Sequence, residues 1–447
     1  MKKCFLLFPI ILALLCSCNA NEEGPTPPDS ENPALKDERS ESEILKIATE
    51  AYKILNNHSR EEISLSASNI VPVGVGKGRS GSQQPDLYAV NYGEGRGFAL
   101  VSSSRKVEPL IGLIENGDYD ADDNSVEPLN NMIDCAEAYV RTKKIITPED
   151  TNKIDFGIKP YYDTIIKVRE SGPRVKVNWS QYWPENMFVS NKVAGCAPVA
   201  LGQAMTFFRT PTQITLTYNS SNQNLILDWE EISKHKRSVD CGPEIPPTFI
   251  IDEHIYECGA TAETHTVIGH LIAELGYRMD AVHNEGETLV SYYELYNVTK
   301  ELISDVKLTE ETDLKNIFKD AFSPDNIIEM IGYGYISDPT QGGFHVWLVD
   351  GAFEMTRTIY YVTGKGIPAT LTYTEISTIT SRYIHNNWGY GRKNGYFIEG
   401  VYDMKKNPVT PPASSDDPPS VIYPAPSRTG VYRYIFNPQS YIKVSKK

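Results

Sequence analysis

The chain has 447 residues and a formal net charge of −15. This length allows two or three domains and is sufficient to bury a sizeable core. The excess of acidic residues argues against nucleic acid as a partner, because a protein that binds nucleic acid presents a basic surface. We expect no metal and no other cofactor, since the cysteines and histidines show no spacing that is typical of a zinc site.

The N-terminus has the pattern of an export signal. Lys2-Lys3 precedes an apolar run from Phe5 to Leu15, which is too short to span a bilayer. The run is followed by Cys16-Ser17-Cys18, which resembles the lipobox of bacterial lipoproteins, where the cysteine after a small residue is acylated. We therefore expect acylation of Cys18. The alternative is an ordinary secretory signal that is cleaved a few residues later.

A polar, proline-rich stretch follows Cys18 and indicates a flexible tether. We predict a lipoprotein signal peptide over residues 1–18 and a tether over residues 19–40. No later segment is long and apolar enough to cross a membrane, so a lipid anchor is the only membrane attachment that we expect. The protein would then be exported and anchored at the outer membrane, on its periplasmic or its surface face, or be released after processing.

Residues 41–146 are expected to form a small α+β domain. Apolar residues recur at helical spacing in its first segment, and two strands flank the loop Gly93–Gly97 as a hairpin. A strand rather than a helix follows these glycines, so they do not indicate a phosphate-binding loop. The expected elements are a helix over residues 41–56, strands over 87–92, 98–102 and 107–113, and a helix over 129–143.

A polar connector is predicted over residues 147–173, and a larger domain of mixed helices and strands over residues 174–447. Residues 409–426 are rich in Pro, Ser and Asp and are predicted to form an exposed loop. Cys241 and Cys258 could form a disulfide in an oxidising compartment or stay free, because spacing alone does not set geometry. The expected elements are helices over residues 264–275 and 292–302, and strands over 328–335, 344–349, 359–363 and 383–388.

Cys196 is the first candidate catalytic residue. Apolar residues recur at helical spacing after it, and Pro198 suits a first helical turn. The helix is expected to end near Thr210, because the residue before Pro211 is pushed out of the α region. Cys196 would then lie at a helix N-terminus, where the dipole and the free N–H groups favour a thiolate and lower the thiol pKa. The alternative is a small buried apolar residue, as most cysteines are.

Three further segments accompany this cysteine. Val177–Asn186 precedes it and contains Gln181, an apolar strand that begins near His345 follows it, and His385–Gly391 comes last. Together the segments resemble the streptopain family of bacterial cysteine endopeptidases, which are distant relatives of papain. The resemblance covers about residues 41–400 and includes the family's prodomain. It implies an α+β fold with a papain-like peptidase domain, in which a helical part bears the nucleophile and an antiparallel sheet forms the other part.

The resemblance also implies a role for individual residues. Cys196 would be the nucleophile, and His345 the general acid and base that protonates the leaving amine. The Gln181 side chain and the Cys196 backbone N–H are expected to stabilise the oxyanion. Trp388 is expected to cover the histidine from water, and the alternative for it is a core aromatic residue.

Asn386 is the residue that we expect to orient His345. Papain-like enzymes carry an asparagine two residues before the tryptophan, where Asn386 stands, whereas streptopain-like sequences usually carry theirs directly before it, where Asn387 stands. Side chains alternate along a strand, so the two asparagines should point to opposite faces, with Asn386 on the face of Trp388. An asparagine carbonyl that accepts the ring N–H would fix the histidine tautomer. Asn387 is then structural; the alternative is that both satisfy backbone groups before Gly389.

The sequence therefore predicts a secreted, lipid-anchored cysteine endopeptidase that is made as a zymogen. Its partners would be protein or peptide substrates and its own prodomain, as an intramolecular inhibitor. The alternative is a streptopain-like lipoprotein whose site has decayed and which acts as a binding or inhibitory protein. Retention of Cys196, His345 and Gln181 argues against decay, because a binding protein would not need all three. The other histidines singled out are expected to be structural or exposed: His254, His265, His270, His283 and His385.

Overall fold

The computed structural model describes residues 38–55, 63–74, 85–123, 125–146, 160–190, 192–236, 248–251, 254–257, 260–284, 287–303, 306–311, 314–334, 343–365, 370–402 and 437–446. The predicted signal peptide with Cys18, nearly all of the tether, the cysteines Cys241 and Cys258, and the predicted loop 409–426 lie outside these residues. Within the described ranges, no helix has the length and apolar character needed to cross a membrane.

The N-terminal unit (residues 38–146) packs two helices against four antiparallel strands. Helix α1 (Glu41–Leu55) begins with a capping box, in which the Ser40 hydroxyl accepts the Glu43 N–H and the Glu43 carboxylate accepts the Ser40 N–H. The predicted elements of this unit are confirmed, although the third predicted strand begins at Leu110 rather than at Val107. The other elements are β1 (Ile70–Pro72), β2 (Leu87–Asn91), β3 (Phe98–Ser102), β4 (Leu110–Ile114) and α2 (Glu127–Ile146).

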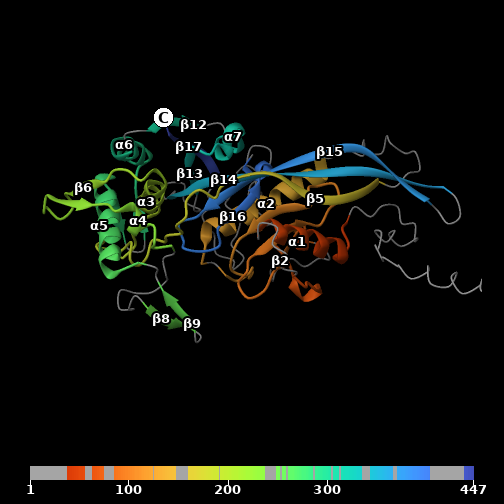
Figure 1. The fold of residues 1–447 in the computed structure, drawn as a ribbon, viewed down its shortest axis with the longest axis horizontal. Coiled ribbons are helices and arrows are strands. Elements are labelled where there is room, and N and C mark those ends of the chain that lie inside the picture. Colours follow the sequence, from red (N-terminus) through yellow and green to blue (C-terminus); the bar gives the residue numbers. More distant parts are fainter. Residues whose placement is uncertain are drawn as a thin grey trace, which may run out of the picture. The chain divides into compact units, whose positions relative to one another are not determined.

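One antiparallel sheet continues from this unit into the second half of the chain (Figure 1). The joint is the pairing of β4 with β16 (Gly395–Ile398), in which Gly395 lies opposite Ile114. A Cβ at Gly395 would lie 2.6 Å from the Leu113 carbonyl oxygen, so the close approach requires glycine. Beyond β16 the order is β15 (Thr370–Asn387), β14 (Gly343–Lys365), β13 (Asn326–Gly334), β17 (Asn437–Lys446) and β12 (Val306–Glu311).

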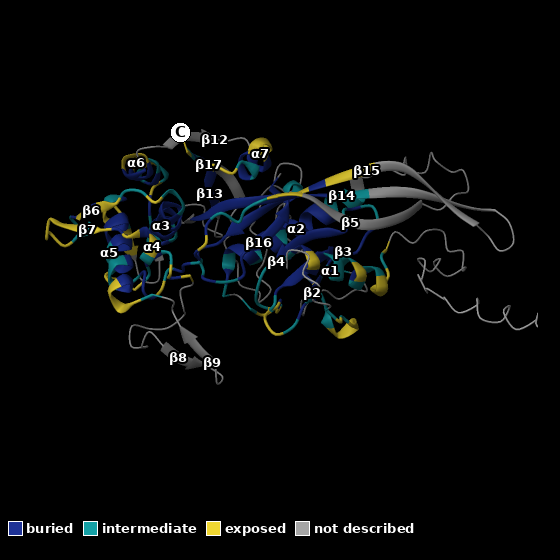
Figure 2. Ribbon diagram, viewed as in Figure 1, coloured by how far each residue is buried: buried dark blue, intermediate teal, exposed yellow. Residues whose placement is uncertain are grey.

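A second apolar core lies under the helices of the second half. Helix α3 (Cys196–Phe208) packs against α5 (Ala262–Arg278) and against β14, and α6 (Tyr292–Leu302) packs against α5. The predicted helix at Cys196 is confirmed, and it ends at Phe208 because Arg209 takes a left-handed conformation with a φ of 56°. The predicted helices over residues 264–275 and 292–302 are confirmed as α5 and α6. Figure 2 shows how densely buried residues line the central strands.

Two predictions for the second half were wrong in their extent. The strands expected over residues 344–349 and 359–363 are parts of one strand, β14. Part of the expected polar connector forms β5 (Pro160–Ser171), which pairs antiparallel with β14. The polar composition of this segment did not indicate a strand, because its partner lies far along the chain and pairing rather than local pattern stabilises it.

Short elements that were not predicted complete the second half. In the described part of the chain they include three two-stranded hairpins, two short α-helices and two 3-10 helices, η3 (Leu314–Asn316) and η5 (Glu399–Tyr402). The hairpins are β6 (Gln213–Leu216) with β7 (Gln223–Ile226), β8 (Thr248–Ile251) with β9 (His254–Glu257), and β10 (Val282–Asn284) with β11 (Glu287–Leu289), and the α-helices are α4 (Trp229–Ile232) and α7 (Ile317–Phe322).

Candidate active site

Cys196 is the first residue of helix α3. Gly195 before it has a φ of 94°, and a Cβ at this position would lie 2.8 Å from the Thr288 methyl carbon. Only glycine combines this backbone conformation with such close packing. The chain therefore turns sharply into the helix and leaves a half-buried thiol at the helix N-terminus.

Strand β14 brings His345 to this thiol. The backbone N–H of Val346, the next residue along the strand, donates to Cys196 Sγ at 3.4 Å. The His345 side chain is buried. Two residues that are far apart in the sequence, the candidate nucleophile and the candidate base, thus lie on elements that touch at the sulfur atom.

The orientation of the His345 ring is set by a backbone group and by aromatic rings. Its Nε2–H donates to the Trp388 carbonyl oxygen at 3.1 Å. The ring stacks on Trp347 with a centroid distance of 5.9 Å, and Tyr390 lies 5.7 Å away at an angle. Trp347 could have been found from the sequence, because it is two residues from His345 on the same strand and therefore on the same face.

The structure gives Asn386 a different partner from the predicted one, whereas the covering role of Trp388 stays a prediction. Asn386 Oδ1 accepts hydrogen bonds from Trp347 Nε1 and from the Tyr402 hydroxyl, both at 2.9 Å. This carbonyl therefore holds Trp347, while the His345 ring N–H is taken by the Trp388 backbone. The indole of Trp388 is buried and donates to the Lys393 carbonyl oxygen at 3.0 Å, whereas Trp347 and Tyr390 supply the ring contacts to the histidine.

Asn387 points to the opposite face, as the alternation along the strand predicted. Its Nδ2 donates to the Val177 carbonyl oxygen at 3.0 Å and to Gln203 Oε1 at 3.1 Å. Gln203 Oε1 also accepts the Trp179 N–H at 2.9 Å. The buried amide of Gln203 therefore ties α3 to both flanking segments, a role that sequence reasoning missed because the partners of a buried amide depend on tertiary packing.

Gln181 lies beside the segment that leads into Cys196. Its carbonyl oxygen accepts the Ala194 N–H at 2.9 Å, two residues before the cysteine. The neighbouring Trp179 carbonyl accepts the Gly391 N–H at 3.1 Å, from the loop that follows Trp388. The segment Val177–Asn186 therefore joins both the chain that leads into α3 and the loop after Trp388.

Burial shifts the pKa values of Cys196 and His345 away from an ion pair, whereas the position of Cys196 at a helix N-terminus predicted a lowered thiol pKa. Burial raises the pKa of the Cys196 thiol, and the N–H groups of Val346, Ala197 and Cys196 itself only partly offset this effect. Burial also lowers the pKa of His345 to about 4, against a weaker opposing effect of the Trp388 carbonyl. The proton therefore stays on sulfur in this state, because desolvation outweighs the helix N-terminus.

Residues 175–397 match the Peptidase C10 family, and residues 40–140 match the Spi protease inhibitor family. This chain is a member of the C10 peptidase family. It is a cysteine-type endopeptidase that carries an inhibitor-type prodomain, as in a zymogen. The prediction of an α+β fold of the streptopain family with its prodomain is confirmed. The domain boundaries proposed from the sequence stay predictions.

Among solved structures, the chain is similar to a fragment of prointerpain A from Prevotella intermedia, with 13% identity and a TM-score of 0.44 over 82% of this chain and 96% of that chain. Active wild-type interpain A from the same organism has 12% identity and a TM-score of 0.35 over 62% of this chain and 98% of that chain. No curated protein matches the chain.

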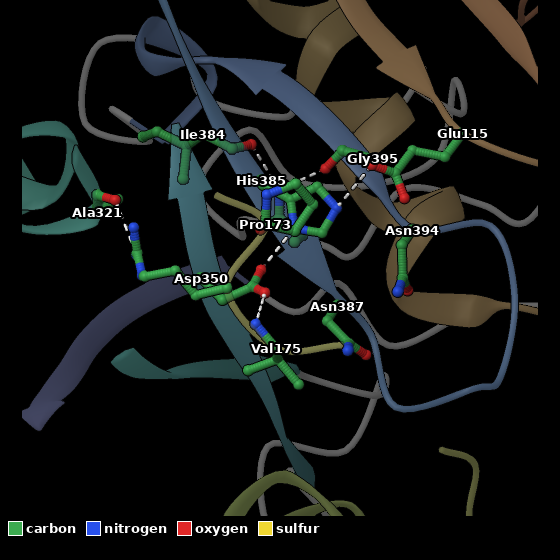
Figure 3. Close-up of polar contacts among 12 residues, drawn as sticks. Glu115, Pro173, Val175, Ala321, Asp350, Ile384, His385, Asn387, Asn394 and Gly395 are labelled. Carbon is green, nitrogen blue, oxygen red and sulfur yellow. Dashed lines mark hydrogen bonds and ion pairs between the residues drawn. The ribbon is translucent and has the colours of Figure 1, made fainter. Parts of the chain in front are cut away.

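A second histidine of the peptidase domain, His385, contacts the prodomain (Figure 3). It lies between two carboxylates, with Nδ1 2.5 Å from Asp350 Oδ1 and Nε2 3.3 Å from Glu115 Oε1 of the prodomain. Burial alone would lower the pKa of His385, but the two carboxylates raise it to about 10. Asp350 is held in turn by the Val175 N–H at 2.9 Å. His385 is therefore a buried structural cation.

His58 and the side chain of His254 on β9 lie outside the described part, and the remaining described histidines have structural or exposed surroundings. His235 pairs with the buried Glu185 at 3.3 Å and packs against His265, whose pKa is lowered to about 4 by burial and then by His235. His270 accepts or donates a hydrogen bond at 2.7 Å with the Tyr218 hydroxyl, and the exposed His283 contacts Thr288. Among the described residues, no group of three or more His, Cys, Asp or Glu side chains could hold a metal ion.

Proposed function

We propose that Cys196 and His345 form the catalytic pair of this peptidase and that the pair becomes a thiolate and an imidazolium after maturation. The observation that supports the assignment is the meeting of α3 and β14 at the sulfur atom, with His345 Nε2 already bound to the Trp388 carbonyl. This hydrogen bond assigns Nδ1 to proton exchange with the thiol.

The reaction follows from these groups. His345 Nδ1 takes the thiol proton, and the Cys196 thiolate attacks the carbonyl carbon of the scissile bond. The oxyanion is stabilised by the Cys196 backbone N–H and by the Gln181 side-chain amide. The imidazolium then protonates the leaving amine, and water hydrolyses the acyl-enzyme with His345 as general base.

Removal of the prodomain provides the activation step. Tyr390, which contacts His345, has a pKa that is raised by burial and then by the nearby Glu127 carboxylate of prodomain helix α2. The prodomain therefore acts electrostatically, through Glu127 of α2, on a ring that contacts His345. Departure of the prodomain admits water, and rehydration lowers the thiol pKa and raises the imidazole pKa, so that both shifts favour the ion pair.

Labelling with a substrate-like epoxide tests the nucleophile. We expect the epoxide to modify Cys196 in the matured enzyme and to abolish proteolysis, and we expect Cys196→Ala to be inactive and unlabelled. Cys241→Ala is the matched control, because Cys241 is another cysteine of the expected peptidase domain and remains in the matured enzyme. Proteolysis by purified Cys196→Ala would refute the assignment, and an active but unlabelled wild type would refute the nucleophile.

A substitution of Gln181 tests the oxyanion site. Loss of one oxyanion donor typically costs about 100-fold to 1,000-fold in kcat, so Gln181→Ala should lower kcat by that factor. Gln223→Ala, a change of an exposed glutamine on β7, should have no effect. An unchanged kcat in Gln181→Ala would remove this residue from the mechanism.

We further propose that the protein is exported and held at the outer membrane by acylation of Cys18. The supporting observations are the small residue Ser17 before it and the polar tether after it. Cells that express the protein with an alkynyl fatty acid in the medium should label the wild type and not Cys18→Ser, and the variant should move from the membrane fraction to the soluble fraction. Cys16→Ser is the matched control, and a variant at Cys18 that stays in the membrane fraction would contradict the proposal.

A further inference from the structure

One loop of the prodomain, residues 115–123, encloses a lysine of the peptidase domain. The Lys393 backbone N–H donates to Asn116 Oδ1 at 2.8 Å, and its ammonium group donates to the Asp118 carbonyl oxygen at 3.0 Å and to Asp123 Oδ2 at 2.7 Å. Lys393 is only 8% exposed. Burial opposes the charge on Asp123, but the hydrogen bond from Lys393 and then those from Ser125 hold its pKa well below the usual range. The carboxylate is therefore charged at neutral pH and neutralises a largely buried ammonium.

Lys393 belongs to the loop that orients the catalytic histidine. Its carbonyl oxygen accepts the Trp388 indole N–H at 3.0 Å, and the Trp388 carbonyl oxygen accepts His345 Nε2–H at 3.1 Å. The φ of Lys393 is 56°, which is uncommon for a residue with a Cβ. The prodomain thus grips this loop at a residue whose backbone conformation costs free energy and needs support from its surroundings.

Neighbouring hydrogen bonds support both the peptidase loop that contains Lys393 and the prodomain loop that encloses it. The Glu115 N–H donates to the Asn394 carbonyl oxygen at 2.9 Å, and Asn394 Oδ1 accepts the Trp388 N–H at 3.2 Å. In the prodomain, the Gly117 N–H donates to the Gly95 carbonyl oxygen at 2.7 Å. A change at Asp123 would therefore leave most of the loop contacts in place and remove mainly the counter-ion of Lys393.

We propose that the pair Asp123–Lys393 is the latch through which the prodomain controls the loop from Trp388 to Gly395 and hence the position of His345. This inference rests on the proposed role of His345. Lys393 is a positioning residue, because it acts through Trp388. When Asp123 loses its charge, the ammonium is left unpaired and must move to water, so the loop leaves its held conformation and the prodomain loosens over the site.

The test is Asp123→Asn in the full-length chain, with Asp122→Asn as the matched control. Both changes remove one negative charge from the prodomain, but Asp122 is exposed, whereas Asp123 forms an ion pair with Lys393. Both leave the matured enzyme identical to the wild type, so a difference belongs to the zymogen. The readout is the initial rate at which iodoacetamide alkylates Cys196, measured in the full-length band of a gel before processing proceeds.

We expect Asp123→Asn to raise this alkylation rate about 10-fold, as the loss of a charge-assisted hydrogen bond implies. Asp122→Asn should stay within about twofold of the wild type, as a surface change does. A wild-type rate in Asp123→Asn, or equal acceleration in both variants, would overturn the latch. A lower Tm in Asp123→Asn without faster alkylation would show a purely structural pair and would also overturn it.

A second variant approaches the latch from the peptidase side. Lys393→Met should accelerate alkylation as Asp123→Asn does, and the double variant should be no faster than either, because both remove one interaction. Lys443→Met is the control, since Lys443 pairs with Asp320 at 3.0 Å within the peptidase domain. Additive effects would overturn the proposal. Failure of the proposed function would be seen in a different measurement: the matured wild-type enzyme would stay active after Cys196 is alkylated.

Discussion

Two buried histidines on neighbouring strands of the peptidase domain have surroundings that shift their pKa values in opposite directions. His345 on β14 meets a backbone carbonyl and aromatic rings, and burial lowers its pKa to about 4. His385 on β15 is just as inaccessible, but the carboxylates of Asp350 and Glu115 raise its pKa to about 10. Burial therefore does not decide the protonation state by itself; the presence of a charged partner does.

The comparison separates the two tasks of the peptidase domain. The region around His345 favours a neutral imidazole, which in the proposed mechanism exchanges a proton with the thiol. The region around His385 keeps a fixed cation that binds the prodomain through Glu115 and the segment at Val175 through Asp350. A change at the first region should therefore affect turnover, and a change at the second should affect stability and the seating of the prodomain.

The largest expected effect breaks the first region. His345→Ala should lower kcat/KM by at least about 1,000-fold, because the members of a nucleophile–base unit do not act additively. The fold should be kept with a moderately lower Tm, because a buried ring that stacks on Trp347 is removed but no ion pair is lost. The measurement is peptide hydrolysis together with a thermal melt. A loss of less than about 10-fold, or a loss of activity that is matched by unfolding, would contradict the assignment.

The second expected effect breaks the other region. His385→Gln leaves Asp350 without its cation, and removal of one partner of a buried pair costs about 3–5 kcal/mol. The change is best measured by urea unfolding of the full-length chain that also carries Cys196→Ala, so that no processing occurs. His283→Gln is the control, because His283 is exposed. Equal unfolding free energies for the two variants would show that the cluster contributes little.

His345 and His385 should affect the free energy of unfolding at different pH values, His345 on the acid side and His385 on the alkaline side. The folded pKa of His345 lies below its ordinary value of 6.5, so its contribution is present above pH 6.5 and lost as the pH falls towards 4. The folded pKa of His385 lies above 6.5, so its contribution is present below pH 6.5 and lost as the pH rises towards 10.

In the Cys196→Ala background, His345→Ala should flatten the acid side of a plot of unfolding free energy against pH, and His385→Gln should flatten the alkaline side. His265, whose pKa is also lowered to about 4, should preserve part of the acid slope. A change on the same side in both variants would contradict the comparison.

Local pattern was sufficient for much of the fold. The helix from Cys196 and the helices and strands of the prodomain follow from apolar periodicity, capping residues and glycine-rich turns. Strand β5 did not, because its partner β14 lies far along the chain and its composition resembles a polar connector. The pairing of β4 with β16 could not be predicted either, since local sequence patterns do not determine which strand edge another strand pairs with.

The site was predictable where a side chain carries the signal. Cys196, His345 and Gln181 were predicted from residue type and order; the structure gathers their segments around the start of α3, and their roles stay predictions. The acceptor of the His345 ring N–H was assigned wrongly to Asn386, because a backbone carbonyl has no residue type to recognise. The upward shift of the Cys196 thiol pKa was also missed, since burial depends on tertiary packing that the sequence does not display.

The smallest expected effect extends the comparison to a buried acid without a charged partner. Glu329 on β13 accepts hydrogen bonds from the Thr299 hydroxyl at 3.2–3.3 Å, and burial raises its pKa to about 8. The folded pKa lies above the ordinary value of 4.5, so the stability that it contributes is present below pH 4.5 and is lost as the pH rises towards 8.

Glu329→Gln, a neutral isostere, should therefore unfold like the parent at pH 4.5 but be more stable by roughly 1–3 kcal/mol at pH 8.5. Urea unfolding of the Cys196→Ala chain at the two pH values measures the difference, with the exposed Glu230→Gln as control. A gain that is equal at both pH values would show that packing rather than ionisation limits stability at this position.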